Sequence, residues 1–213
     1  MRIYSTLFSH FGRQKWWPAS GGFKPAEWEI CVGAILTQNT SWNNVEKALA
    51  NLKKERIIAP EDIINIEIKK LEELIRPSGF FSQKTKRLKE FAKFVLSFEN
   101  FEKFKEKVTR EKLLAVKGIG PETADSILLY ACGRPVFVVD AYAKRIFYRL
   151  GIIENNLNYE DIKNFFEKNL PRDTKLYNEF HALIVGHGKT ICKKEPLCSQ
   201  CTLEKMCEKR GVA

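Results

Sequence analysis

Apolar residues recur at intervals of three and four along most of the chain, the spacing that places side chains on one face of an α-helix. The segment 42–54 is an example, and 83–98 combines an apolar face of Leu, Phe and Val with a basic one. Residues 26–38 are largely apolar, as in a helix that is buried on most sides. The best strand candidate, 134–139, is short. The pattern therefore predicts an all-α protein.

Glycine and proline separate the predicted helices. One helix is expected to stop near Arg76, just ahead of a proline. Farther along, the Gly-Ile-Gly turn at 118–120 is followed by Pro121, which suits the first position of a helix. Residues 70–92 and 111–132 thus share one order, a helix, a turn with glycine and a second helix. The second of these segments has the form of a helical hairpin.

The composition and charge of the chain narrow its class. Of 213 residues 44% are hydrophobic, which is enough for a folded core and excludes a disordered protein. Lys and Arg number 36 against 26 Asp and Glu, and the net charge of +10 favours a polyanionic partner, nucleic acid above all. No apolar run approaches the roughly 20 residues of a membrane-spanning helix, and the N-terminus lacks the apolar centre of a signal peptide. We therefore expect a cytoplasmic protein without membrane contact.

Four of the six cysteines lie close together near the C-terminus in the array C-x5-C-x2-C-x5-C: Cys192, Cys198, Cys201 and Cys207. This basic segment is too poor in apolar residues to fold by itself, and crowded thiolates repel unless a cation neutralises them. An iron–sulfur cluster, a zinc site with four thiolates and two disulfides all use such cysteines. One short C-x2-C with longer arms favours the cluster over zinc, and a cytosolic compartment disfavours disulfides. Cys31 and Cys132 lie in apolar helices and are expected to be buried.

Two features beyond residue 110 have both a structural and a chemical interpretation. The glycines at 118 and 120 allow positive φ and close approach to another surface, and Lys117 adds charge beside them. The turn therefore suits a phosphate as well as a plain helix connection. Asp140, which precedes a helical segment, is typical of an N-cap residue. A cap and a chemical role for this carboxylate are compatible.

Three separated motifs resemble the endonuclease III superfamily of DNA glycosylases. Residues 113–146, LLAVKGIGPETADSILLYACGRPVFVVDAYAKRI, look like its helix–hairpin–helix, its Gly/Pro-rich loop and its essential aspartate. Residues 34–49, AILTQNTSWNNVEKAL, resemble its early helix and Q-x-T loop. The tail 187–207, HGKTICKKEPLCSQCTLEKMC, is similar to its iron–sulfur loop, with five residues in the first gap instead of the usual six.

The resemblance implies two helical lobes with a DNA-binding cleft. Residues 24–135 would form a continuous helical domain that carries the hairpin. Residues 1–23 plus 136–213 would form a second helical domain, with a structural 4Fe-4S cluster in the loop 192–207. A monomer, associated with the nucleoid through DNA, would bind double-stranded DNA with a damaged base flipped out. The expected DNA contacts are Lys84 and the hairpin residues Lys117, Gly118, Ile119 and Gly120.

The resemblance also implies roles for three polar residues. Gln38 matches the residue that fills the hole left by the flipped base. Asp140 matches the carboxylate that stabilises positive charge on the sugar and helps orient the attacking water. Glu122 stands where bifunctional members carry a lysine, whose amine forms a Schiff base with the sugar. A carboxylate forms no imine, so Asp140 and Glu122 predict a monofunctional enzyme that leaves an abasic site. Glu122 also suits a plain first-turn acid that complements the helix dipole.

The aromatic N-terminal segment indicates which class of damaged base the enzyme would excise. Adenine-excising members keep a glutamate on the early helix that protonates the purine, and 30–40 contains no acid. An N3-alkylated purine is positively charged, leaves without protonation and binds electron-rich rings. Trp16, Trp17 and Pro18, with Trp42, are the expected base contacts, and the WWP sequence resembles the 3-methyladenine glycosylase branch. The tryptophan pair is equally suited to packing between the lobes.

Two other functions are considered beside the alkylated-purine glycosylase. A uracil or thymine mismatch glycosylase also uses a monofunctional site with a residue other than lysine at 122. A non-catalytic DNA-binding iron–sulfur module would keep the hairpin and the cysteines, but the presence of both Asp140 and Gln38 argues against it.

Overall fold

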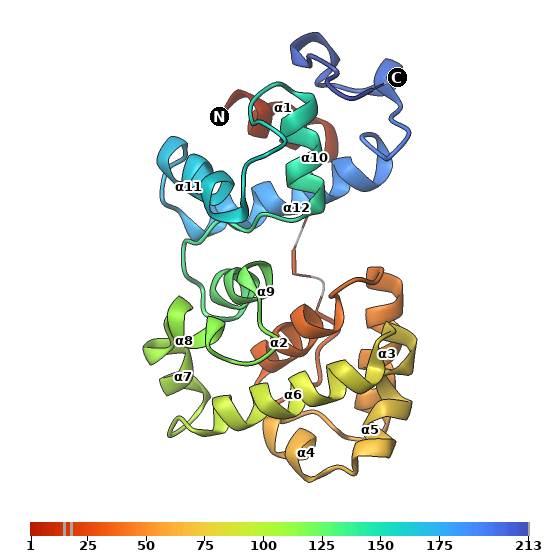
Figure 1. Cartoon of the computed structure of the whole chain (residues 1–213), viewed down its shortest axis with the longest axis vertical. Helices are drawn as coiled ribbons and strands as arrows, with labels where there is room; N and C mark the ends of the chain where they lie inside the picture. The colour runs from red at the N-terminus through yellow and green to blue at the C-terminus, as the bar shows by residue number, and fades with distance from the viewer. Residues whose placement is uncertain (15, 18, 213) are drawn as a thin grey trace. The chain divides into compact units, whose positions relative to one another are not determined.

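The computed structural model describes residues 1–14, 16–17 and 19–212. It divides into two compact units, one of Met1–Pro18 with Arg134–Ala213 and the other of Ala19–Gly133. These boundaries lie a few residues from those expected from the resemblance. Every regular element among the described residues is helical, which confirms the all-α prediction there (Figure 1). The strand candidate 134–139 is an irregular segment.

The discontinuous unit has α12 at its centre, packed against α1 and α10. Its core is aromatic: Phe137 stacks on Phe166 with ring centroids 4.2 Å apart, and Tyr177 is fully buried. The elements of this unit are α1 (Arg2–Phe11), α10 (Ala141–Arg149), α11 (Tyr159–Asn169), α12 (Thr174–Thr190) and the short turns η3 (Cys198–Gln200) and η4 (Glu204–Met206).

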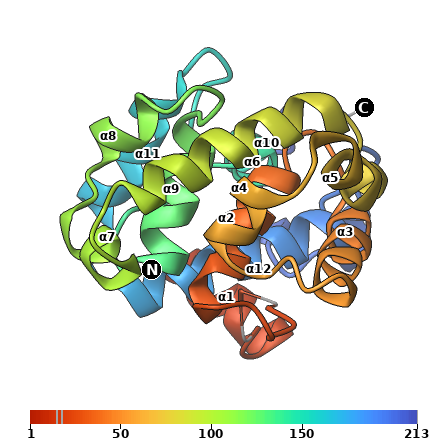
Figure 2. The same ribbon diagram turned by 90° about the horizontal axis from the view of Figure 1, so that it is seen from below.

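The continuous unit is built around the apolar helix α2, which contacts α3, α6 and α9 (Figure 2). Trp28 is fully buried on α2 and stacks parallel to Phe91, with centroids 5.7 Å apart. The apolar run at 26–38 thus forms the buried helix that its composition predicts. The elements are α2 (Ala26–Leu36), α3 (Trp42–Lys54), α4 (Pro60–Asn65), α5 (Ile68–Ile75), η1 (Arg76–Ser78), α6 (Phe81–Leu96), α7 (Phe101–Lys107), α8 (Arg110–Leu114), α9 (Pro121–Ser126) and the π-helical turn η2 (Ile127–Ala131).

The predicted helical hairpin is present as α8, a turn and α9, and Pro121 is the first residue of α9. Within the described part of the chain, no helix is long and apolar enough to cross a membrane.

Candidate active site

The hairpin turn depends on one glycine in a left-handed conformation. Gly118 has a φ of 92°, and a Cβ at this position would lie 2.5 Å from Cγ of Arg87. Gly120 has a φ of −93° and caps α9, so the expectation of a positive φ at both glycines is wrong for the second. Lys117 is exposed, whereas the Ile119 side chain is buried. The backbone N–H of Ile119 donates to the carbonyl of Val116 at 3.0 Å within the turn.

A buried ion pair fixes α8 against α9. Nε of Arg110 lies 2.6 Å from Oδ1 of Asp125, and its Nη2 donates to Oδ2 at 3.2 Å. Asp125 is fully buried, so the two hydrogen bonds offset the cost of removing a carboxylate from water. Sequence reasoning missed this pair, although an aspartate inside the apolar stretch after Pro121 was a signal that a buried partner was needed.

Gln38 links the loop after α2 to the hairpin. Its Nε2 donates to the carbonyl oxygen of Gly118 at 3.2 Å and to Oγ1 of Thr123 at 2.9 Å. Its Oε1 accepts a hydrogen bond from the Arg87 guanidinium. The amide thus holds the turn, and Gln38 has to exchange these bonds before it can enter DNA. Its expected role in filling the hole of a flipped base stays a prediction.

Lys84 was expected to contact DNA, but its side chain lies in the interior of the continuous unit. The residue is fully buried, and its Nζ donates to the carbonyls of Leu36 at 2.8 Å and Ser78 at 2.6 Å. It therefore satisfies carbonyl groups at the C-terminal end of α2 and in η1. Burial, with a smaller effect from the charge of Arg87, lowers the pKa of Lys84 to about 8.

Asp140 is the N-cap of α10, as its position predicts. Oδ1 accepts the backbone N–H of Ala143 at 2.7 Å. Oδ2 lies 3.6 Å from Nε2 of His181 on α12, and the side chains of Asp140 and His181 are only 13% and 7% exposed. Sequence reasoning gave His181 no role, because a partner 41 positions away leaves no mark in local periodicity.

Glu122 is the second residue of α9 and is exposed. Its backbone carbonyl accepts the hydroxyl of Ser126 at 2.7 Å. The placement fits the first-turn acid that the sequence indicates, and it leaves a catalytic role untested. Glu122 and Gln38 belong to the continuous unit, whereas Asp140 belongs to the discontinuous one.

The tryptophan pair lies in the same unit as Asp140. Trp16 and Trp17 are half-buried, with ring centroids 5.8 Å apart and ring planes at 65°. Nζ of Lys189 lies 5.9 Å from the centroid of the Trp16 ring, within the range of a cation–π contact. Pro18, the third expected member of this site, lies outside the described residues. Trp42 is half-buried at the start of α3, in the other unit.

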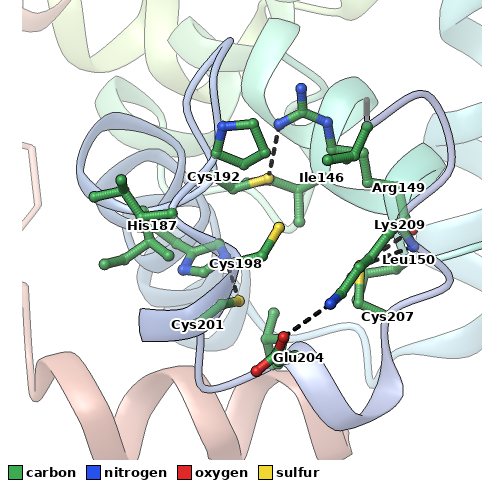
Figure 3. Close-up of a pocket in the computed structure, with 15 residues that line it drawn as sticks. Ile146, Arg149, Leu150, His187, Cys192, Cys198, Cys201, Glu204, Cys207 and Lys209 are labelled. Atoms are coloured by element: carbon green, nitrogen blue, oxygen red, sulfur yellow. Dashed lines mark hydrogen bonds and ion pairs between the residues drawn. The ribbon is translucent and has the colours of Figure 1, made fainter.

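The four clustered cysteines line one cavity, together with apolar side chains such as Ile146 and Leu203 (Figure 3). None of the six cysteines forms a disulfide. Burial raises the pKa of Cys201, and its three cysteine neighbours act in the same direction. Across the described ranges, no group of three or more His, Cys, Asp or Glu side chains is arranged to hold a single metal ion.

Arginines of α10 hold this cysteine loop. Arg149 donates from Nη1 to Sγ of Cys192 at 3.4 Å, and its guanidinium also binds the carbonyls of Lys193 and Lys194. Arg145 donates to the carbonyls of Cys192 and Gly188 at 3.0 Å. The loop is thereby attached to the same helix that Asp140 caps.

Comparison with known families places the chain among the helix–hairpin–helix DNA repair proteins. The model of the HhH-GPD superfamily of base excision DNA repair proteins matches residues 32–172, and the chain belongs to this family. A protein of Methanocaldococcus jannaschii that is assigned as a DNA repair glycosylase is 49% identical over 97% of this chain and 94% of its own. Endonuclease III of Thermotoga maritima is 31% identical over 84% of this chain and 81% of its own.

Solved structures agree with this family. The H. pylori 3-methyladenine DNA glycosylase bound to 1,N6-ethenoadenine has a TM-score of 0.78 and 39% identity, and covers 88% of this chain and 96% of its own. A trapped endonuclease III–DNA covalent intermediate has a TM-score of 0.83 at 20% identity, over 98% of this chain and 93% of its own. At 20% identity, the similarity to endonuclease III shows a shared fold and nothing more.

Proposed function

We propose that the protein is a monofunctional DNA glycosylase that hydrolyses the N-glycosidic bond of alkylated purines such as 3-methyladenine. The observation that carries the proposal is the pair of carboxylates at two helix starts. Asp140 caps α10, and Glu122 lies in the first turn of α9, at the position where the resemblance places the lysine of bifunctional enzymes. The identity of 39% with the H. pylori 3-methyladenine DNA glycosylase supports the substrate class.

The reaction needs an anion near the sugar and a water molecule. The bond between the sugar and the base breaks, and its electron pair leaves with the base, which departs neutral because the alkylated ring was a cation. The carboxylate of Asp140 stabilises the positive charge that develops on the sugar. The water oxygen then bonds to the anomeric carbon, and its proton passes to Asp140 or to solvent. Because Glu122 supplies no amine, the strand stays intact at the abasic site.

Damaged double-stranded DNA is the proposed partner. The net charge of +10 favours a polyanion. The exposed ammonium of Lys117 lies beside Gly118 in the hairpin turn, where it is suited to contact a DNA phosphate. Contacts of this kind fix the position of the strand without reading its sequence.

Trp16 and Trp17 are the proposed contacts for the flipped base. Their half-buried rings offer the stacking surface that a positively charged purine prefers. The ammonium of Lys189 already lies near the Trp16 ring, and two cations repel. A cationic base on that face therefore has to displace Lys189.

We infer that the cysteine loop holds a 4Fe-4S cluster. Four thiols around one apolar cavity match the donor set of such a cluster, and N–H groups of Arg149 and Lys209 lie 3.4 Å from Sγ of Cys192 and Cys207. When bound, the cluster would supply the positive charge that lets crowded thiolates coexist and would order the loop. Visible absorption from thiolate-to-iron charge transfer, with iron and sulfide analysis, tests this assignment. Bound zinc without iron would contradict it.

An excision panel tests the function. Oligonucleotides with 3-methyladenine, 7-methylguanine, uracil or a T:G mismatch are incubated with the protein, and both free base and strand nicks are measured. Release of methylated base without nicking is expected. Activity on uracil or T:G alone would favour the mismatch enzyme, which is supported by 29% identity over 84% of this chain with the thymine-DNA glycosylase of Aeropyrum pernix. No excision of any base would favour the non-catalytic module.

Borohydride trapping tests the absence of a lyase step separately. Reduction traps a Schiff base as a covalent enzyme–DNA adduct, and none is expected here. Efficient trapping on a substrate that the protein excises would show that another amine replaces the lysine absent at 122.

A further inference from the structure

The carboxylate of Asp140 is held from two directions by groups of its own unit. Oδ1 is committed to the backbone N–H of Ala143, 2.7 Å away. Oδ2, the oxygen that does not cap the helix through this bond, faces Nε2 of His181 at 3.6 Å. Both side chains are nearly buried, so water competes little for either. Because α10 packs directly on α12, the two residues approach from elements that are fixed relative to each other.

The contact matters because a carboxylate at a helix start has a competing arrangement. A helix N-terminus presents several backbone N–H groups and positive potential, and both carboxylate oxygens can turn toward them. An oxygen drawn into the helix has less negative charge to offer to a sugar. A neighbour on the far side of the carboxylate opposes that rotation. The distance of 3.6 Å exceeds that of a hydrogen bond, so an imidazole with its hydrogen on Nε2 would attract the carboxylate electrostatically, and the ring also occupies the space beside Oδ2.

We propose that His181 is a positioning residue that keeps Oδ2 of Asp140 turned away from the start of α10 and available to the sugar. This inference rests on the proposed glycosylase function. His181 touches neither the base nor the sugar in the proposed reaction, and its effect passes through the orientation of the carboxylate.

Three variants separate this role from simple packing. His181→Leu removes the polar group and retains bulk, whereas His181→Gln can place an amide N–H close to the position of Nε2. His10→Ala changes an exposed histidine at the end of α1 and serves as the control. Single-turnover excision on the alkylated substrate, binding to DNA with an abasic-site analogue, and melting temperature are measured for each.

On the order of a tenfold fall in the excision rate is expected for His181→Leu, with product-DNA binding within about twofold of wild type. His181→Gln should recover most of the rate. Wild-type rates in both His181 variants would overturn the proposal. So would rates that fall only in proportion to lost stability and binding, because a packing residue behaves that way.

A double variant checks whether His181 acts through Asp140. In the Asp140→Asn background, adding His181→Leu should change the remaining rate by less than about twofold, because the group being positioned is gone. A further tenfold loss would show an independent role and overturn the proposal. A wild-type protein that excises nothing from the panel instead refutes the proposed function, so the two failures are distinguishable.

Discussion

Substitution of Asp140 by Asn separates the two roles of this residue, because asparagine caps helices about as well as aspartate does. The amide oxygen can still accept the Ala143 N–H, now 2.7 Å from Oδ1, so the free energy of unfolding should change by only a few tenths of a kcal/mol. Asp140→Ala removes the cap and should cost about 1 kcal/mol, which lowers the melting temperature by about 2–4 °C in a chain of this size.

The chemical effect of the same two variants should be equal and much larger. Both lose the negative charge that stabilises the cationic sugar, and removal of one such electrostatic group typically lowers the rate by about 10²–10³, or roughly 3–4 kcal/mol of barrier. Single-turnover excision with free-base detection measures the rate, and thermal unfolding measures the cap. A stable Asp140→Asn protein that excises as fast as wild type would refute the mechanism. An inactive Asn variant that is also strongly destabilised would refute the separation of cap and chemistry.

Three further predictions concern the packing around the site. Gly118→Ala should destabilise by about 2–3 kcal/mol and weaken DNA binding, because the added Cβ combines a positive φ with a clash. Gly133→Ala, where φ is positive but the Cβ meets no other atom, should cost only about 1 kcal/mol, and equal losses would contradict this. Arg110→Ala should cost about 3 kcal/mol in denaturant unfolding, because it removes the charged hydrogen-bond partner of a fully buried carboxylate. A change below about 0.5 kcal/mol would refute that. Burial lowers the folded-state pKa of Lys84 to about 8, from 10.5 when unfolded, so stability relative to Lys84→Met should rise as the pH increases from 8 to 10.5; a flat or falling difference contradicts this sign.

Local chemistry was sufficient to predict the helix starts and the buried helix. Asp140 caps α10 and Pro121 begins α9, because both effects involve only residues within one turn. Trp28 is in the core because α2 is largely apolar. In each case the relevant interactions are encoded within about ten positions.

Lys84 is a charged residue whose burial was not expected. It lies four positions before Leu88 and seven before Phe91, which places it on the buried face of α6. The helical periodicity of this segment therefore predicts a buried Lys84, although the residue was expected to contact DNA. The carbonyls that accept its ammonium come from other segments, α2 and η1, and no local pattern reveals them.

The partners of Asp140, Asp125 and Gln38 depend on tertiary packing in the same way. His181 and the acceptors of Gln38 are brought together by helices that are distant in sequence. Sequence reasoning identifies the polar residues that need partners, and the structure is required to name the partners.

Helix α10 carries Asp140 at its first turn and the arginine that holds Cys192 at its last. The nine residues of α10, at 1.5 Å each, span about 13 Å. The carboxylate of Asp140 and the attachment point of the cysteine loop therefore lie at opposite ends of one short helix. Hydrogen exchange at the Ala143 amide, which Asp140 protects, should therefore report whether the cysteine loop at the other end of α10 is ordered. A preparation with a damaged or incomplete cysteine loop should reveal itself by faster exchange at that amide, without any measurement of metal or of activity.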